Sequence, residues 1–283
     1  MPVDPGAVGR RVGPVRRTWD ERDAILYALG VGAGAEDPCE ELQYTTENTE
    51  GVAQRALPTI AVVLGNAMEG LLDQAGDFDR SMMVHGFQGV TLFDEIPVAG
   101  EIETVSEIVG VHDKGSGALV VGEMTSRLVG SDRPLFSCRN GVFVRGAGGF
   151  GGDRGPSGAV PVPDRAPDLE VRCTTRPDQA LLYRLSFDRF PLHSDPAYAR
   201  RAGFERPILH GLCTYGFTGR VLLRDWCDDD PARCAAMEGR FSSPVLPGEE
   251  LVVQSWELDD GVAFVTRGGD GRVVLDGGRL TRR

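Results

Sequence analysis

An aspartate and a histidine five residues apart are the most informative residues of this 283-residue chain. Asp188 and His193 lie in the segment FDRFPLHSDP, with Pro191 between them. Proline removes a backbone donor and restricts the residue before it, so the segment is predicted to be a shaped loop rather than one face of a helix. A carboxylate and an imidazole in such a loop can hold a water molecule, take its proton and return a proton elsewhere. Taken alone, the same pair also fits a purely structural hydrogen bond.

The segment RPILHGL at residues 206–212 adds a second chemical group. Its proline favours the start of a helix, and the apolar residues that follow predict a long helix with Gly211 in its first turn. The first N–H groups of a helix have no partner within it and carry partial positive charge. The N–H of Gly211 can therefore bind a thioester carbonyl oxygen that becomes an enolate. His210 is expected either to contact the ligand or to pack behind the site.

The two halves of the chain repeat one order of elements. AILYAL at residues 24–29 matches ALLYRL at 180–185, and the apolar stretch after Pro58 matches the one after Pro207. Each half is predicted to contain a short helix, an irregular stretch, a long apolar helix opened by proline, and then strands. The predicted strands cover residues 100–112, 118–129, 135–144, 237–242, 250–258, 262–267 and 272–280. A long helix wrapped by an antiparallel sheet is the hot-dog architecture, so we expect an α+β double hot-dog.

Gly and Pro concentrate between the halves, at residues 148–163. This segment has few side chains with which to build a core, so it is predicted to link an N-terminal repeat at residues 1–147 to a C-terminal repeat at 164–283. Only the C-terminal repeat contains the Asp188 and His193 pair, so it is expected to be catalytic, and the non-catalytic N-terminal repeat is expected to house the tail of the ligand. Residues 3–14 are predicted to form a loose tail.

Composition narrows the class of protein. Lys and Arg total 30 against 42 Asp and Glu, for a net charge of −12, which argues against nucleic acid and anionic membrane surfaces as partners. No apolar run approaches the roughly 20 residues that span a bilayer, and the N-terminus does not resemble a signal peptide. The six cysteines are scattered without a metal-binding spacing, so free thiols in the cytoplasm and no metal are expected.

The segments FDRFPLHSDP and RPILHGL together resemble the signature of the MaoC-like, R-specific 2-enoyl-CoA hydratases. In that signature D-x-N-P-x-H precedes a P-I-L-H-G helix start. The resemblance runs from about residue 19 to the C-terminus and includes VHGFQ at 84–88 and DKG at 113–115. It implies a double hot-dog that hydrates a trans-2-enoyl-CoA to the (R)-3-hydroxyacyl-CoA, or catalyses the reverse dehydration. By this resemblance, Asp188 and His193 activate water and Gly211 supplies the oxyanion N–H. It also implies a homodimer and no cofactor, coenzyme A entering only as the substrate thioester.

Three phenylalanines depart from the family's pattern. Phe190 stands where the family has Asn, Phe187 where it has Gly, and Phe87 where it has Glu. A phenyl ring cannot anchor a catalytic water, and losing one such hydrogen-bonding group typically costs on the order of 10² in rate. Phe187 and Phe190 are therefore candidate substrate-binding residues. They either reshape the pocket for an unusual acyl group or leave a protein with weak catalysis.

Arginines cluster around the aspartate and histidine. Residues 184–206 contain five arginines and three acids, a local charge of +2. Arg189 and Arg206 are candidate substrate-binding residues, because guanidinium groups suit the phosphates of coenzyme A. The alternative is a solvated surface with ordinary ion pairs.

Two other functions fit the same residues. A hot-dog acyl-CoA thioesterase would use a helix N-terminus and an acidic residue to release the thiol. An acyl-thioester-binding protein would keep the pocket and lose the turnover. The carrier of the thioester, coenzyme A or acyl carrier protein, stays open.

Overall fold

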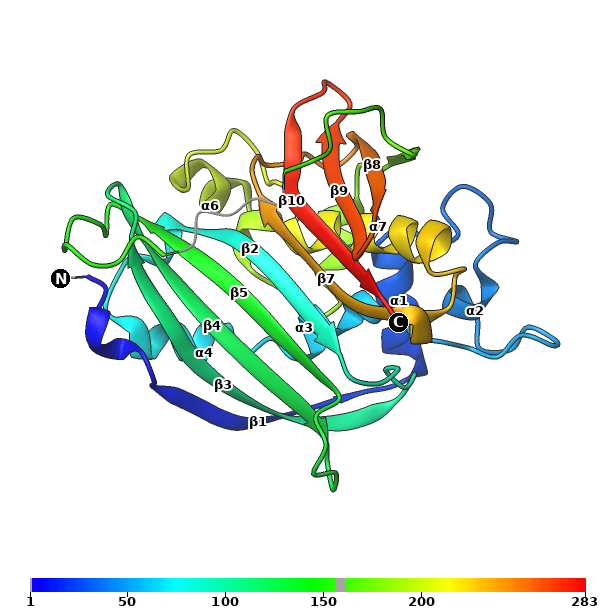
Figure 1. The fold of residues 1–283 in the computed structure, drawn as a ribbon, viewed down its shortest axis with the longest axis horizontal. Coiled ribbons are helices and arrows are strands. Elements are labelled where there is room, and N and C mark those ends of the chain that lie inside the picture. The colour runs from blue at the N-terminus through cyan, green and yellow to red at the C-terminus, as the bar shows by residue number, and fades with distance from the viewer. Residues whose placement is uncertain (1, 156–160) are drawn as a thin grey trace.

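A computed structural model describes residues 2–155 and 161–283, so residues 156–160 of the predicted linker lie outside the described part. The described strands form one antiparallel sheet of ten strands, with the helices on one side of it (Figure 1). The strands are β1 (Arg11–Trp19), β2 (Met83–Leu92), β3 (Gly100–Asp113), β4 (Gly117–Leu128), β5 (Phe136–Arg145), β6 (Leu169–Thr174), β7 (Cys234–Phe241), β8 (Glu250–Leu258), β9 (Gly261–Gly268) and β10 (Val273–Arg282). The helices are α1 (Glu21–Gly30), α2 (Leu42–Thr45), α3 (Ala61–Leu64), α4 (Met68–Ala75), α5 (Gln179–Tyr183), α6 (Pro196–Arg201) and α7 (Gly211–Trp226).

The strand order shows that the chain is a duplicated unit. It runs β1-β3-β4-β5-β2-β7-β10-β9-β8-β6, so each strand of the first half has a counterpart at the mirrored place in the second. The halves join where β2 pairs with β7, from Phe87 opposite Arg240 to Thr91 opposite Ala236. The predicted α+β double hot-dog is therefore confirmed. Every strand predicted from alternation is present, whereas β1, β2 and β6 were not predicted.

The long helix α7 forms the centre of the C-terminal half. Its residues from Leu212 to Leu223 are buried, as expected for a helix enclosed by other elements. Polar groups on it are paired inside the core: the Tyr215 hydroxyl donates to the Met237 carbonyl at 2.7 Å. This packing holds the N-terminal end of α7, at Gly211, in a fixed place relative to the sheet.

The prediction of one long helix after Pro58 was wrong. The chain forms a 3-10 turn at Pro58–Ile60, the short helix α3, a break at Gly65, and then α4. A Cβ at Gly65 would lie 2.6 Å from the Phe136 ring, so the glycine allows a close approach to the sheet. Just before α4, the Asn66 side-chain oxygen accepts the N–H of Met68, the first residue of that helix, at 3.2 Å. The first half therefore has the two short helices α3 and α4 where the second half has the single helix α7.

The glycine-rich segment after β5 folds back onto the β3–β4 turn. The Asp113 carboxylate accepts the N–H groups of Gly149, Gly115 and Gly151 at 2.9, 2.8 and 2.7 Å. These bonds hold the pKa of Asp113 at about 2, below its ordinary range. The start of the predicted linker, residues 148–163, is therefore attached to the N-terminal half by a charged acceptor.

The N-terminal residues are packed rather than loose. Val3 is fully buried, the Asp4 N–H donates to the Ala75 carbonyl at 2.8 Å, and β1 begins at Arg11. The predicted tail at residues 3–14 was therefore wrong, because its few apolar side chains find partners on α4 and β3 that are distant in sequence. Within the described residues, no helix is long and apolar enough to cross a membrane.

Candidate active site

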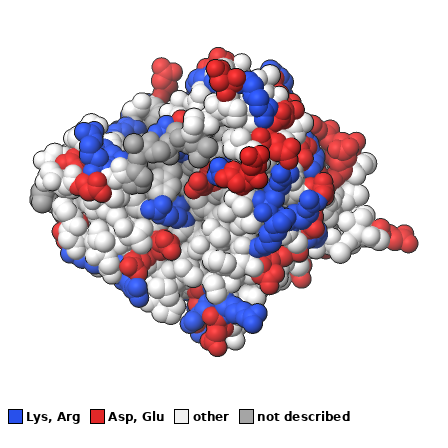
Figure 2. Space-filling model, viewed as in Figure 1, with Lys and Arg blue, Asp and Glu red and all other residues white. Residues whose placement is uncertain are grey.

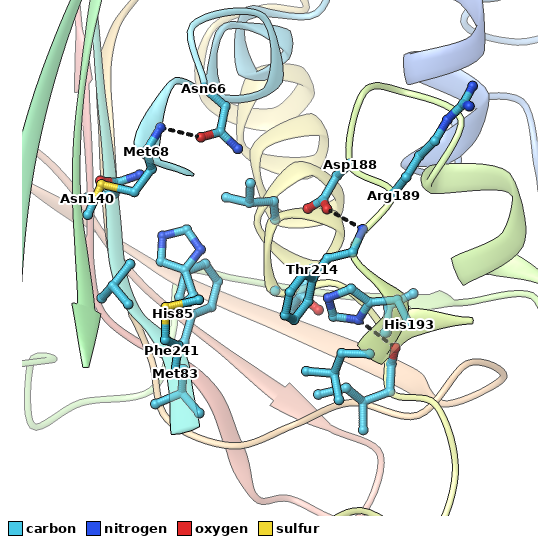
Figure 3. A pocket seen from close by; sticks show the side chains of 18 of the residues that line it. Asn66, Met68, Met83, His85, Asn140, Asp188, Arg189, His193, Thr214 and Phe241 are labelled. Atoms are coloured by element: carbon cyan, nitrogen blue, oxygen red, sulfur yellow. Dashed lines mark hydrogen bonds between the residues drawn. The ribbon is translucent and has the colours of Figure 1, made fainter. Parts of the chain in front are cut away.

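One cavity of about 1300 Å³ collects the residues that could do chemistry. Its lining comes from both halves of the chain, and the catalytic candidates face residues of the first half across it (Figure 3). The lining includes Asp188, His193, Gly211, Phe187, Arg189, Phe190, Arg17, Asn66, His85, Asn140 and Phe241. The three groups that the sequence singles out for catalysis therefore share one space.

The loop that carries Asp188 and His193 is shaped as its proline predicts. A 3-10 turn covers Pro191–His193, and the Phe190 N–H donates to the Asp188 carboxylate at 3.3 Å. The His193 Nδ1 lies 2.9 Å from the Ile208 carbonyl, which can only accept, so Nδ1 carries the proton. The other ring nitrogen, Nε2, is then unprotonated in the neutral ring and can act as a base.

Burial controls the charge of His193. It lowers the pKa of this imidazole below its ordinary value of 6.5, and the nearby Asp188 carboxylate opposes the shift without cancelling it. The ring is therefore neutral at neutral pH. A neutral imidazole beside a carboxylate is the state that a general base requires.

Gly211 is the first residue of α7, so its N–H is one that the helix itself does not use. A Cβ at this position would lie 3.1 Å from the Phe241 ring, a tight contact that glycine avoids. The amide is thus presented at the cavity wall without a side chain in front of it. Such an amide can stabilise developing negative charge on a carbonyl oxygen.

His210 packs behind the loop that carries Asp188 and His193 and is not among the residues that line the cavity. Its ring stacks on that of His193 with centroids 3.7 Å apart, and its Nε2 lies 3.2 Å from the Asp188 carbonyl. Burial, and after it the neighbouring His193, lower the pKa of His210 well below its ordinary value. Of the two sequence-based expectations for His210, the packed position is the one observed.

Of the other four predicted substrate-binding residues, three line the cavity and one does not. Phe187, Phe190 and Arg189 line the cavity, although the Arg189 side chain extends away from Asp188 (Figure 3). Arg206 is not among the residues that line it. Of the predicted site residues, all except His210 and Arg206 therefore line this cavity.

Phe187 has an unusual backbone. Its φ of 70° is in the left-handed region, which glycine adopts without cost and other residues adopt at about 1–2 kcal/mol. The glycine of the resembled family would adopt this backbone without that cost, whereas Phe187 adopts it with a side chain. Its ring packs against the core and lies under the Arg17 guanidinium, 4.9 Å away.

Phe190 packs outward as well as lining the cavity. Its ring meets the Tyr198 ring edge to face with centroids 5.3 Å apart, and lies 6.3 Å from His193. The ring thus packs on Tyr198 of α6 while it lines the same cavity as Asp188 and His193.

The opposite wall was missed by the sequence analysis. His85 on β2 and Asn140 on β5 lie there, together with Asn66 (Figure 3). Burial lowers the pKa of His85 to about 4, so this ring is also neutral. The segment VHGFQ carried a signal for His85. The pairing of β2 with β5, which sets His85 opposite Val142 and Gln88 opposite Asn140, joins residues over 50 positions apart.

Comparison with known proteins identifies the family. Residues 18–146 match the MFE-2 hydratase 2 N-terminal domain, and residues 159–277 match the MaoC like domain. The chain is 43% identical to the 3-hydroxyacyl-thioester dehydratase Y of Mycobacterium tuberculosis over 99% of this chain and 98% of that protein. The chain belongs to the MaoC-like dehydratase family. The predicted membership of a hydratase and dehydratase family, whose members are lyases, is thus confirmed.

Other MaoC-like relatives agree in sequence and fold. The Probable enoyl-CoA hydratase 2 of Dictyostelium discoideum is 37% identical over 96% of this chain and 93% of its own length. The crystal structure of a MaoC-like dehydratase from Phytophthora capsici has a TM-score of 0.88 at 30% identity, covering 99% of this chain and 98% of that one. The match therefore extends over both repeats of the family's fold.

Proposed function

We propose that this protein hydrates a trans-2-enoyl-CoA thioester to the (R)-3-hydroxyacyl-CoA, or catalyses the reverse dehydration. The observation that carries the proposal is that Asp188, His193 and the N–H of Gly211 line one cavity. Relatives named as a 3-hydroxyacyl-thioester dehydratase and an enoyl-CoA hydratase support the class of substrate.

The chemistry follows from what each group can do. The thioester carbonyl accepts a hydrogen bond from the Gly211 N–H, which stabilises the negative charge that develops when water adds to Cβ. Asp188 and His193 hold the water and take one of its protons, while its hydroxyl bonds to Cβ. The same pair returns a proton to Cα, so one water is added and no cofactor is consumed. Dehydration follows the same steps in reverse.

We further propose that the two repeats have different roles in the reaction. Asp188 and His193 belong to the C-terminal repeat, residues 164–283, and the opposite wall with His85 and Asn140 comes from the N-terminal repeat, residues 1–147. The acyl chain is proposed to lie against that opposite wall. Arg189, at the cavity and without an ion pair among the described residues, is a candidate for a phosphate of coenzyme A.

The kind of partner is proposed from charge, the cytoplasmic location from the free cysteines, and the homodimer from the family resemblance. A net charge of −12 disfavours nucleic acid and anionic membrane, and the face in Figure 2 mixes basic and acidic side chains without a continuous basic surface. We propose a cytoplasmic homodimer that acts on a coenzyme A or acyl-carrier thioester.

Two measurements on the purified protein test the proposed reaction. Hydration of crotonyl-CoA or a longer 2-enoyl-CoA bleaches the enoyl-thioester absorbance and releases no thiol. A thioesterase would release free coenzyme A at the same rate as it consumes the thioester. An acyl-thioester-binding protein would bind the same compounds with neither signal. Absence of bleaching across a panel of chain lengths would reject the hydratase proposal.

A further inference from the structure

Arg17 is a cavity-lining guanidinium without a carboxylate partner among the described residues. It lies on β1, the edge strand of the N-terminal repeat, and reaches the same cavity as Asp188. Within the described part of the chain, its side chain makes one hydrogen bond, from Nη2 to the Asn66 carbonyl at 3.3 Å. A guanidinium has five N–H donors, so most of the hydrogen-bonding capacity of Arg17 is unused by the protein.

The neighbouring arginine shows what an ordinary surface arginine does on this strand. Arg16 is exposed and donates to the Glu103 carboxylate at 2.8 Å from Nη2 and 3.1 Å from Nε. Arg17 is partly buried, and burial alone lowers its pKa, since no carboxylate is close enough to raise it. The two residues are adjacent in sequence and differ in burial and in partners.

A partly buried cation without a counter-charge is costly, because it loses water without gaining an ion pair. Here the Phe187 ring lies 4.9 Å from the guanidinium carbon, and a cation–π contact of this kind recovers only part of that cost. The face of the guanidinium is therefore occupied while its edge donors stay available. Edge donors in this geometry suit a carboxylate or phosphate.

We propose that Arg17 is an anion subsite of the cavity, which binds a negatively charged group of the thioester substrate. This inference rests on the proposed function and adds a class of substrate to it. Phe187 directly precedes Asp188, so the subsite lies beside the catalytic loop. The anion is either a carboxylate on the acyl chain or a phosphate of coenzyme A.

Three thioesters separate these sources when wild type and Arg17→Gln are compared. The first is a 2-enoyl-CoA with a terminal carboxylate, the second its methyl-terminated counterpart, and the third the methyl-terminated chain on N-acetylcysteamine, which has no phosphate. Loss of a charge-assisted hydrogen bond lowers kcat/KM by about 10- to 100-fold. Arg17→Lys, which keeps the charge, is expected to recover part of the loss. Arg16→Gln is the matched control, and melting temperatures check that each variant is folded.

Each pattern of results has one meaning. A loss confined to the carboxylated substrate identifies an acyl carboxylate as the anion. A similar loss on both coenzyme A thioesters, with the N-acetylcysteamine thioester unaffected, identifies a phosphate. Equal losses on all three, or no loss on any, overturn the subsite. If wild type turns over none of the three, the proposed reaction fails by itself, and calorimetric binding of the saturated thioesters to the same variants still tests Arg17.

Discussion

The imidazole rings of His193 and His210 lie face to face, with centroids 3.7 Å apart and an angle of 27° between their planes. Two protonated imidazoles would repel at this distance, and burial lowers the pKa of both. The His210 ring also reaches the Asp188 carbonyl with Nε2, at 3.2 Å. One buried ring thus contacts both residues of the proposed catalytic pair, and we expect His210 to position them.

Replacing His210 tests this role. His210→Ala is expected to lower kcat by about 10- to 100-fold with a smaller change in KM, because a misplaced catalytic group affects the reaction more than binding. His210→Phe keeps a ring against His193 and is expected to retain more activity than the alanine variant. The measurement is steady-state bleaching of a 2-enoyl-CoA. Unchanged kcat in His210→Ala would contradict the assignment.

Removing either member of the catalytic pair is expected to stop the reaction. Asp188→Asn and His193→Ala should each lower kcat/KM by about 10²- to 10⁴-fold, the usual contribution of a general acid–base group. Circular dichroism and melting temperature should stay close to wild type, since Asp188 and His193 both lie at the cavity wall. Near-normal turnover in either variant would reject the proposed mechanism.

The Phe190 ring is expected to belong to a working pocket. It packs edge to face on Tyr198 on α6, so Phe190→Asn removes a contact that steadies the loop between Asp188 and His193. We predict that kcat/KM falls by about 10-fold on the best enoyl-CoA of a panel. Phe190→Leu, which keeps an apolar side chain, should lose less. A sharp rise in Phe190→Asn would instead mean that the ring impairs the family's ordinary chemistry.

Acid should destabilise the fold through His85. The pKa of this imidazole is about 4 in the folded chain against an ordinary 6.5, so between these values the unfolded chain takes up a proton that the folded chain excludes. The loss of stability caused by this difference in proton uptake is absent above pH 6.5 and complete below pH 4. Between pH 7.5 and 5.0 it lowers the free energy of unfolding by up to about 2 kcal/mol.

Urea unfolding of wild type and His85→Gln at these two pH values measures that contribution. His193 and His210 shift in the same direction in both proteins, so only the difference between the two pH dependences reports on His85. Equal pH dependence in the two proteins would show that the His85 imidazole is not excluded from protonation in the fold.

A buried ion pair joins the two halves at residues that do not line the cavity. Arg220 on α7 donates to the Glu41 carboxylate at 2.7 and 2.8 Å, and its Nε donates to the Val31 carbonyl at 3.2 Å. The Arg220 side chain is 8% exposed and that of Glu41 15%. Removing one partner leaves a buried charge unpaired, so Glu41→Gln or Arg220→Met is expected to cost about 3–5 kcal/mol.

Urea denaturation of the single and double variants measures this pair. The double variant Glu41→Gln with Arg220→Met should lose less than the sum of the single losses, because no charge then remains unpaired. Additive losses would mean that Glu41 and Arg220 act independently.

Local chemistry was readable from the sequence. Pro191 between Asp188 and His193 predicts a loop, and alternation places β8 at the bounds the structure shows. The apolar run after Pro207 predicts α7, although that helix begins at Gly211 rather than directly after the proline. These features depend on residues a few positions apart, and dihedral restriction and side-chain periodicity act over that range. The two-fold order of elements could be predicted as well, because each half of the sequence contains the same succession of local patterns.

The cavity was decided by the tertiary structure alone. Arg17, His85 and Asn140 come from strands far apart in sequence, and they meet Asp188 only because the sheet continues from β2 to β7. The break at Gly65 depends on how closely Phe136 approaches, and the burial of Val3 on contacts with α4, neither of which a local pattern records. Long-range pairing and burial also set the neutral state of His193. The sequence therefore indicated which side chains could react, and packing decided which residues face them across the cavity.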